Sequence, residues 1–249
     1  MKLNLRNDAI PFGTNINSVE VPVEMTKKFL SGLDYFDAQI GGQGFTPSTS
    51  VLFTGESGAG KTTMLLTLAN ALTTAGVVTV FNTAEESLYQ VRLACKRLRL
   101  NRGFATGSET DVSLLLRKAE VLRQHAADNG KPFMLFVDSL QCMEDDSGAG
   151  QNRMAEQALF KITSWCKEKY TNAIIIGQVT KGGKFAGTNK LKHAVDTHIH
   201  LSVEKKDEDL IGCRRLETEK NRFGGGVGKT TWLSLGEHGF KVVAVTETE

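Results

Sequence analysis

The sequence predicts an α/β domain with a mainly parallel, twisted sheet that is flanked by helices and ends in antiparallel strands. Up to about residue 178, short apolar runs alternate with longer amphipathic runs, which is the pattern of strands connected by helices. From residue 196 onward, polar and apolar residues alternate in successive runs, which indicates hairpins. A glycine-rich turn also separates the first apolar run from the helix expected after it. One core domain at 31–249 with an arm at 1–30 accounts for these features.

The glycine-rich turn fits the phosphate-binding pattern G-x-x-x-x-G-K-[ST] at every specified position. A strand is expected at 51–53 and a helix from 62 to about 72, and this context favours a phosphate loop over a chance glycine-rich turn. Backbone N–H groups of such a loop point at phosphate oxygens, and the helix dipole favours the anion. Lys61 is expected to reach the β- and γ-phosphates, and the Thr62 hydroxyl to ligate Mg²⁺. The candidate nucleotide-binding residues here are Gly55, Glu56, Ser57, Gly58, Ala59, Gly60, Lys61, Thr62 and Thr63.

Further elements follow from the same patterns. A short helix is expected between 29 and 37, and Asp111 is expected to be a helix N-cap. Strands are predicted at 77–81, 133–137, 173–177, 197–204, 211–220, 230–235 and 241–247, and helices at 87–100, 111–127 and 152–170. In the arm, Pro11, Phe12 and the apolar run at 19–23 would either dock on a neighbouring subunit or form an edge strand.

Composition indicates a cytosolic protein. Hydrophobic residues make up 40% and charged residues 23%, no apolar run approaches the ~20 residues of a membrane span, and the N-terminus lacks the apolar stretch of a signal peptide. We therefore expect no membrane partner. The formal net charge of +2 is too small to indicate nucleic acid, so DNA contacts must come from local patches.

Cysteines and histidines give no metal pattern. We expect buried, reduced thiols, because no C-x-x-C pair exists among Cys95, Cys142, Cys166 and Cys213. His198 and His200 would share one face of a strand. A core role is expected for them rather than metal binding, because no carboxylate or cysteine stands nearby at ligand spacing.

Three polar residues follow buried strands and complete a hydrolytic site. Asp138 ends the strand at 133–137 and is expected to hold Mg²⁺, although an aspartate there could also be a turn residue. Glu85 follows the second strand and is assigned as the base, whereas Glu86 suits a helix N-terminus. Gln178 ends the next strand, where its amide could contact the γ-phosphate as a sensor.

Together these motifs resemble the ATPase core of the bacterial RadA (Sms) recombination proteins, relatives of RecA and of DnaB-type helicases. The resemblance runs from about residue 30 to 246 and is carried by AEES (84–87), VDSLQ (137–141), VTKGGKFAG (179–187), HAVD (193–196) and KNRFG (220–224). It implies a RecA-like P-loop NTPase fold that binds ATP and Mg²⁺. Glu85 then matches the catalytic glutamate, Asp138 the Walker B aspartate, and Gln178 the sensor position, where RadA proteins usually have histidine.

The KNRFG match implies a role between subunits. In this superfamily, basic residues at the positions of Lys220 and Arg222 reach the γ-phosphate of the neighbouring subunit. A cation brought in this way stabilises transition-state charge and makes hydrolysis depend on assembly. Without the motif, both residues would be interpreted as a solvated basic strand end.

The sequence differs from RadA proteins in two ways, and it contains one further segment that resembles a phosphate loop. RadA proteins carry an N-terminal four-cysteine zinc finger, whereas this sequence has no C-x-x-C pair. They also carry a C-terminal Lon-like domain, for which the residues after KNRFG leave no room. A minimal motor core is therefore expected, suited to a bacteriophage or a compact genome. Residues 224–231 imitate a second phosphate loop. We expect a hairpin loop there, because a strand rather than a helix follows.

The segment at 181–193 joins cations, glycines and an aromatic residue directly after the sensor. Lysines there would hold phosphates and the aromatic ring would pack on bases or sugars, although a solvated loop is the competing interpretation. The candidate DNA-binding residues are Lys181, Lys184, Phe185, Lys190 and Lys192. A second candidate, the loop at 144–153, is acidic at its start.

The sequence therefore predicts an ATP-hydrolysing motor for homologous recombination or repair. It would form a homo-oligomer, either a hexameric ring or a helical filament, bind single-stranded DNA, and promote branch migration or strand exchange with recombination or replication proteins. The alternatives are a RecA-like recombinase, a DnaB-like helicase core and, from another class, a KaiC-like regulatory ATPase without DNA binding. ATP turnover with and without single-stranded DNA separates these classes.

Overall fold

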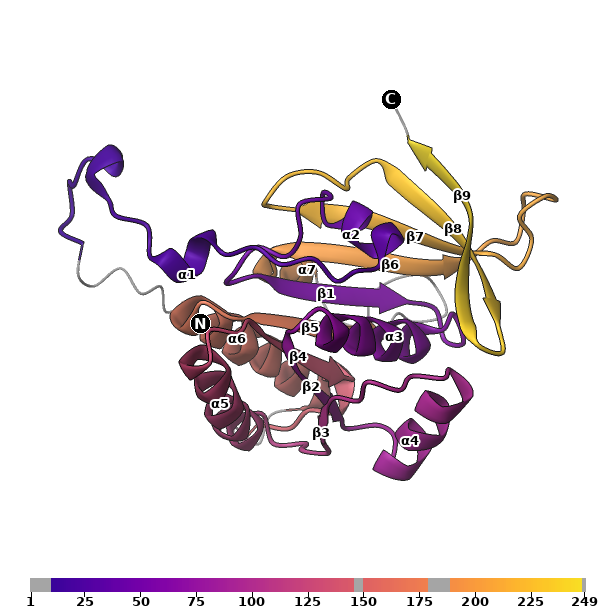
Figure 1. The fold of residues 1–249 in the computed structure, drawn as a ribbon, viewed down its shortest axis with the longest axis horizontal. Coiled ribbons are helices and arrows are strands. Elements are labelled where there is room, and N and C mark those ends of the chain that lie inside the picture. The colour runs from indigo at the N-terminus through magenta and orange to yellow at the C-terminus, as the bar shows by residue number, and fades with distance from the viewer. Residues whose placement is uncertain (1–9, 146–149, 179–188, 248–249) are drawn as a thin grey trace.

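The computed structural model describes residues 10–145, 150–178 and 189–247. A nine-stranded sheet runs through it in the order β3-β2-β4-β5-β1-β6-β7-β8-β9 (Figure 1). The strands are β1 (Ser50–Gly55), β2 (Val78–Thr83), β3 (Ala105–Gly107), β4 (Phe133–Asp138), β5 (Asn172–Gln178), β6 (Thr197–Val203), β7 (Arg214–Asn221), β8 (Lys229–Gly236) and β9 (Gly239–Glu247). The helices are α1 (Val23–Thr26), α2 (Asp34–Gln39), α3 (Lys61–Thr74), α4 (Leu88–Arg97), α5 (Val112–Asp128), α6 (Gln151–Lys169) and α7 (Asn189–Ala194), with 3-10 turns η1 (Ile16–Ser18) and η2 (Leu140–Cys142).

The sheet has a parallel and an antiparallel half. Strands β3, β2, β4, β5, β1 and β6 pair in parallel, whereas β7 pairs antiparallel with β6, β8 with β7, and β9 with β8. This arrangement confirms the predicted fold class. Because the carboxyl ends of parallel strands meet at one sheet edge, the ends of β1, β2, β4 and β5 bring polar residues together there.

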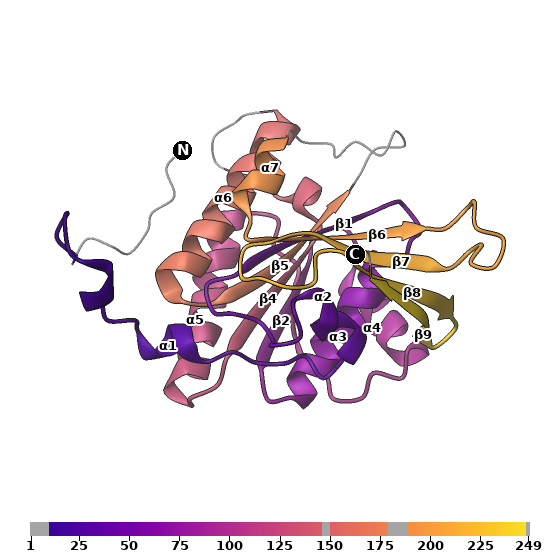
Figure 2. The same cartoon turned by 90° about the horizontal axis from the view of Figure 1, so that it is seen from above.

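Helices lie on both faces of the sheet, and α2 contacts β7 and β8 of its antiparallel half. Helices α2, α3 and α4 lie on one face and α5, α6 and α7 on the other (Figure 2). Alternate residues of β1 divide between the two cores: Phe53 belongs to the cluster that includes residues of α3, and Leu52 to the cluster that includes residues of α6. Both side chains are fully buried, which explains why these strands are continuous apolar runs.

Most predicted elements are confirmed within a few residues, and the helix caps explain why. Asp111 accepts a hydrogen bond from the Leu114 backbone at the start of α5, and Ser87 forms a reciprocal capping box with Gln90 at the start of α4. Strand β3 was not predicted, because its three residues are largely exposed and carry no apolar pattern. Helix α7 is a correction, since 189–192 were expected to be loop.

The N-terminal arm holds no strand between residues 10 and 22, so the edge-strand alternative is wrong. Phe12 and Ile16 are exposed along a chain that extends away from the sheet (Figure 1). The arm joins the body where Phe29 bridges Phe45 and their rings stack. Among the described helices, none has both the length and the apolar character that crossing a membrane requires.

Candidate nucleotide site

The phosphate loop occupies the turn from β1 into α3. Gly58 and Gly60 adopt positive φ angles of 76° and 100°, a conformation that favours glycine. Lys61 opens the helix, and its Nζ donates to the carbonyl oxygens of Gly55 at 3.0 Å and of Glu56 at 2.9 Å. Burial lowers the pKa of Lys61, while the carboxylates of Asp138 and Glu85 oppose that shift. The loop thus wraps around a half-buried ammonium group.

The predicted magnesium ligands lie side by side. Thr62 Oγ1 donates to Asp138 Oδ2 at 2.7 Å, linking the start of α3 to the end of β4. Burial raises the pKa of Asp138 to about 6, opposed by the Thr62 hydrogen bond and reinforced by the nearby carboxylates of Glu85 and Glu86. A hydroxyl and a carboxylate are hard oxygen donors of the kind that Mg²⁺ prefers, so these residues fit that ion.

The predicted base and sensor also meet. Gln178 Nε2 donates to Glu85 Oε2 at 2.9 Å. The neighbouring Glu86 is tied into the turn before α4, since its backbone N–H donates to Thr83 Oγ1 at 3.0 Å. Glu85 is therefore the exposed carboxylate that faces the sheet edge, and Glu86 has a local structural contact.

The structure adds a residue that sequence reasoning missed. The backbone N–H of Gln178 donates to Oε1 of Gln141 at 3.2 Å. Gln141 lies in η2, three residues after Asp138, and closes the VDSLQ segment. It therefore links the segment after β4 to the end of β5, and its place in a conspicuous motif was the available signal.

The family model described as "ATPase family associated with various cellular activities (AAA)" matches residues 51–203, which is more than half of the chain. The chain belongs to this family. The matched residues of this AAA ATPase begin in β1 and end with β6, so they include Lys61, Glu85, Asp138 and Gln178.

Curated relatives of this AAA ATPase are named DNA repair protein RadA. The chain is 32% identical to the protein of Haemophilus influenzae over 228 residues, which are 90% of this chain and 46% of that protein. It is 32% identical over 198 residues to the protein of Aquifex aeolicus and 29% over 229 residues to that of Escherichia coli, covering 41% and 46% of those chains. The resemblance to the RadA ATPase core is confirmed, and the chain spans less than half the length of these relatives. They are bacterial and give no support to a bacteriophage origin.

A solved structure shares the fold of this AAA ATPase. The KaiC-like protein of Pyrococcus horikoshii superposes with a TM-score of 0.69 at 20% identity, covering 88% of this chain and 99% of that one. At this identity the likeness shows the fold alone. The RecA-like prediction is confirmed as a fold.

The basic residues of the KNRFG segment are bound within their own chain. Lys220 Nζ donates to the carbonyl oxygens of Val195 at 2.7 Å, Lys192 at 2.9 Å and His193 at 3.3 Å. Arg222 donates to the His193 carbonyl at 3.0 Å, and its guanidinium lies 3.4 Å from Asp196. Both residues therefore hold the carboxyl end of α7 in this structure.

Three of the five candidate DNA-binding residues, Lys181, Lys184 and Phe185, lie outside the residues that the structure describes. Lys190 lies in α7. Lys192 Nζ donates to Glu219 Oε2 at 2.8 Å, so its ammonium is partnered on the protein surface. The segment at 224–231, which resembles a phosphate loop, forms the connection after β7 and the first residues of β8. A strand rather than a helix therefore follows it, as expected.

Two expectations about thiols and histidines need correction. Cys95 and Cys166 are buried, but Cys142 and Cys213 are only partly so. A carboxylate does stand beside the histidine pair: Glu219 Oε2 lies 2.9 Å from His198 Nδ1. The sequence could not show this, because Glu219 comes from β7, about twenty residues further along the chain.

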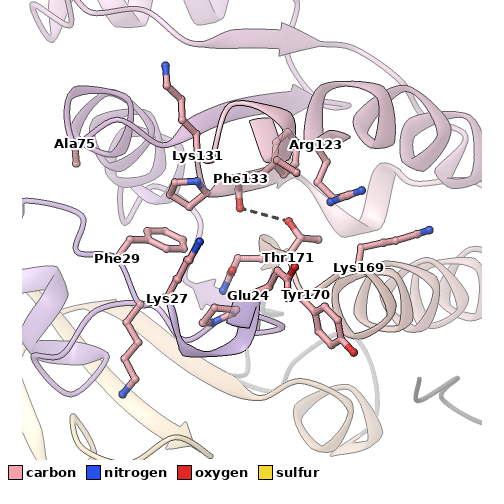
Figure 3. Close-up of a pocket in the computed structure, with 16 residues that line it drawn as sticks. Glu24, Lys27, Phe29, Ala75, Arg123, Lys131, Phe133, Lys169, Tyr170 and Thr171 are labelled. Carbon is pink, nitrogen blue, oxygen red and sulfur yellow. Dashed lines mark hydrogen bonds between the residues drawn. The ribbon is translucent and has the colours of Figure 1, made fainter. Parts of the chain in front are cut away.

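A cavity of about 450 Å³ (Figure 3) lies at the amino ends of β4 and β5. It borders Phe133 and Asn172, which begin β4 and β5, whereas Asp138 and Gln178 end these strands. Its lining is basic and aromatic, with Lys27, Phe29, Arg123, Lys131, Lys169 and Tyr170. This hollow is therefore separate from the nucleotide site, where the Lys61 side chain lies back against the phosphate loop.

Proposed function

We propose that this chain is an ATP-hydrolysing motor that acts as a homo-oligomer on single-stranded DNA in recombination or repair. The proposed working unit is a core at 31–249 preceded by an arm at 1–30. Membership in the AAA family supports the hydrolysis, and the name of the RadA relatives supports the role in DNA repair.

In the proposed site, residues 55–63 hold the phosphates of ATP through backbone N–H groups and the Lys61 ammonium. Thr62 and Asp138 hold Mg²⁺, which neutralises charge on the β- and γ-phosphates. Glu85 accepts a proton from the attacking water, because its exposed carboxylate lies at the same sheet edge as Asp138. Gln178 orients that carboxylate.

The hydrogen bond from Gln178 to Glu85 is the observation that carries the proposal. Gln178 lies shortly before the lysine- and glycine-rich segment at 181–193, which contains the candidate DNA-binding residues. A ligand that bound this segment would displace Gln178 and, through it, the proposed base. The bond thereby supports a hydrolysis rate that responds to DNA.

The proposed assembly rests on the RadA-like KNRFG segment. Lys220 and Arg222 would contact the γ-phosphate of a neighbouring subunit, which requires that they exchange their present carbonyl partners for phosphate. An isolated subunit is then expected to bind ATP and hydrolyse it slowly.

The test compares ATP turnover with and without single-stranded DNA over a range of protein concentrations. Stimulation by DNA that rises with protein concentration supports the motor. Turnover that is never stimulated, at any salt concentration, instead assigns the chain to the KaiC-like regulatory class. Gln178→Ala serves as the matched variant, since it should weaken stimulation while nucleotide binding persists.

A further inference from the structure

A second polar cluster lies beyond the phosphate loop, where β6 joins the antiparallel half of the sheet. His198 and His200 are two residues apart on β6 and so project from one face. In the pairing of β6 with β7, His198 lies opposite Lys220 and Ile199 lies opposite Thr218. Glu219 is therefore the extra residue of a β-bulge. Bulges re-aim side chains, and here the bulge turns Glu219 toward the histidines.

The cluster has the geometry of a ligand set. One ligand atom each from His198, His200 and Glu219 lies within 4.8 Å of the other two. His198 is 1% exposed, whereas the Glu219 side chain is 40% exposed. The group is thus closed on the side of the sheet and accessible from the side of Glu219.

The donor types decide which ion would suit. Two imidazole nitrogens and one carboxylate are the ligands of three-residue zinc sites, in which a water molecule takes the fourth position. Mg²⁺ and Ca²⁺ instead prefer all-oxygen sites such as Thr62 with Asp138. We propose that His198, His200 and Glu219 form a binding site for a divalent transition-metal ion of the zinc class, distinct from the magnesium site.

Thr54 supplies the outer contact that such sites require. Its Oγ1 lies 2.7 Å from His198 Nε2 and 2.8 Å from His200 Nδ1, and it is buried between the two rings. A hydroxyl on one ring nitrogen fixes the orientation of an imidazole whose other nitrogen binds metal. Thr54 directly precedes Gly55, so the site adjoins the strand that leads into the phosphate loop.

Lys192 is the competitor of the ion. Its Nζ lies 2.8 Å from the same Glu219 oxygen that approaches His198. An ion on this carboxylate and the Lys192 ammonium would repel one another, so we expect the ion to displace Lys192 from Glu219. Removing the lysine charge should therefore raise the affinity for the metal ion. If the cluster were held together by hydrogen bonds alone, this substitution would not create any metal binding.

The test titrates the metal-free chain with Co²⁺ and Zn²⁺ in the absence of nucleotide. Visible absorption of bound Co²⁺ reports nitrogen ligation, and calorimetry gives the Zn²⁺ affinity. The wild type should bind one ion per chain, His200→Gln and Glu219→Gln should each lower the affinity about 10-fold or more, and Lys192→Met should raise it. Both variants should fold, because His200 and Glu219 are not fully buried, and circular dichroism checks this.

Controls separate this site from other ligands. Asp138→Asn removes the proposed magnesium ligand and should leave Co²⁺ binding unchanged, as should His125→Gln and His238→Gln at exposed positions. The proposal is overturned if the wild type shows no Co²⁺ absorption, or if His200→Gln and Glu219→Gln bind Co²⁺ as tightly as the wild type. The cluster would then be a hydrogen-bonded network only, and the proposed ATPase would be unaffected.

Discussion

Gln178 Nε2 donates a hydrogen bond to Glu85 Oε2 at 2.9 Å, joining the ends of two strands that are not neighbours in the sheet. Glu85 follows β2 and Gln178 ends β5, with β4 and its Asp138 between them. The bond therefore spans the strand that carries the proposed magnesium ligand. The contact joins Glu85 and Gln178 at the sheet edge where β4 also ends in Asp138.

Glu85→Gln should reduce ATP turnover by about 10²–10⁴-fold, because an amide cannot accept the proton of the attacking water. Binding of ATP should persist, since Glu85 is not part of the phosphate loop. Steady-state turnover and fluorescence binding of a labelled nucleotide measure the two effects. Glu86→Gln is the matched control and should remain active; equal losses in both variants would contradict the assignment of Glu85.

Asp138→Asn should raise the stability of the nucleotide-free protein at pH 7 and abolish hydrolysis. Because the folded-state pKa of Asp138 is raised from 3.8 to about 6, the folded protein binds more protons than the unfolded chain between these values. Stability is then lost as pH rises through that range, by about 2–3 kcal/mol for this group. Denaturant unfolding at pH 4 and pH 7 should show that the stability difference between variant and wild type is small at pH 4 and close to its full size at pH 7.

Gly60→Ala should destabilise the phosphate loop, because φ is +100° and an added Cβ would lie 2.9 Å from the Phe240 ring. The left-handed conformation alone costs about 1–2 kcal/mol in a residue with a side chain. Gly130→Ala is the control, since its φ is +64° and its Cβ would meet open space. Thermal unfolding should show a larger loss for Gly60→Ala, together with loss of nucleotide binding that Gly130→Ala retains.

Lys220→Met should loosen α7, because the ammonium donates to three carbonyl oxygens at its carboxyl end. Amide hydrogen exchange should rise across 189–195. If Lys220 also contacts a neighbouring nucleotide, DNA-stimulated turnover at high protein concentration should fall as well. Faster exchange with unchanged stimulated turnover would leave Lys220 a purely structural role.

Asp196→Ala should destabilise the fold by about 3–5 kcal/mol, since it removes one partner of a buried ion pair. Asp196 is 1% exposed, accepts from Lys167 Nζ at 2.8 Å, and accepts from both the backbone and the hydroxyl of Ser50. Chemical denaturation measures the loss. A cost below about 1 kcal/mol, typical of surface pairs, would show that the pair is not effectively desolvated.

Sequence patterns predicted the parallel half of the sheet well, because buried strands and amphipathic helices have distinct periods and clear caps such as Asp111. They also placed Lys61, Thr62, Asp138, Glu85 and Gln178 at one sheet edge, since each stands at the end of a strand or the start of a helix. Their roles stay predictions.

Local patterns failed where distant strands determine a contact. Glu219 lies beside His198 because of a bulge in the pairing of β6 with β7. The pattern of polar and apolar residues in one sequence does not reveal such a bulge. The carbonyl partners of Lys220 depend on α7, a short helix that propensity alone did not reveal. Strand β3 was too short and too exposed to show alternation.

The carbonyl contacts of Lys61 bear on how tightly a nucleotide would be held. The positive-φ glycines and the adjacent Phe240 fix the backbone shape of the phosphate loop, whereas the Lys61 ammonium would exchange its carbonyl contacts for phosphate oxygens. The loop backbone therefore loses conformational entropy when the protein folds rather than when the phosphate binds. This preorganisation leaves more of the interaction energy with the phosphates to appear as affinity.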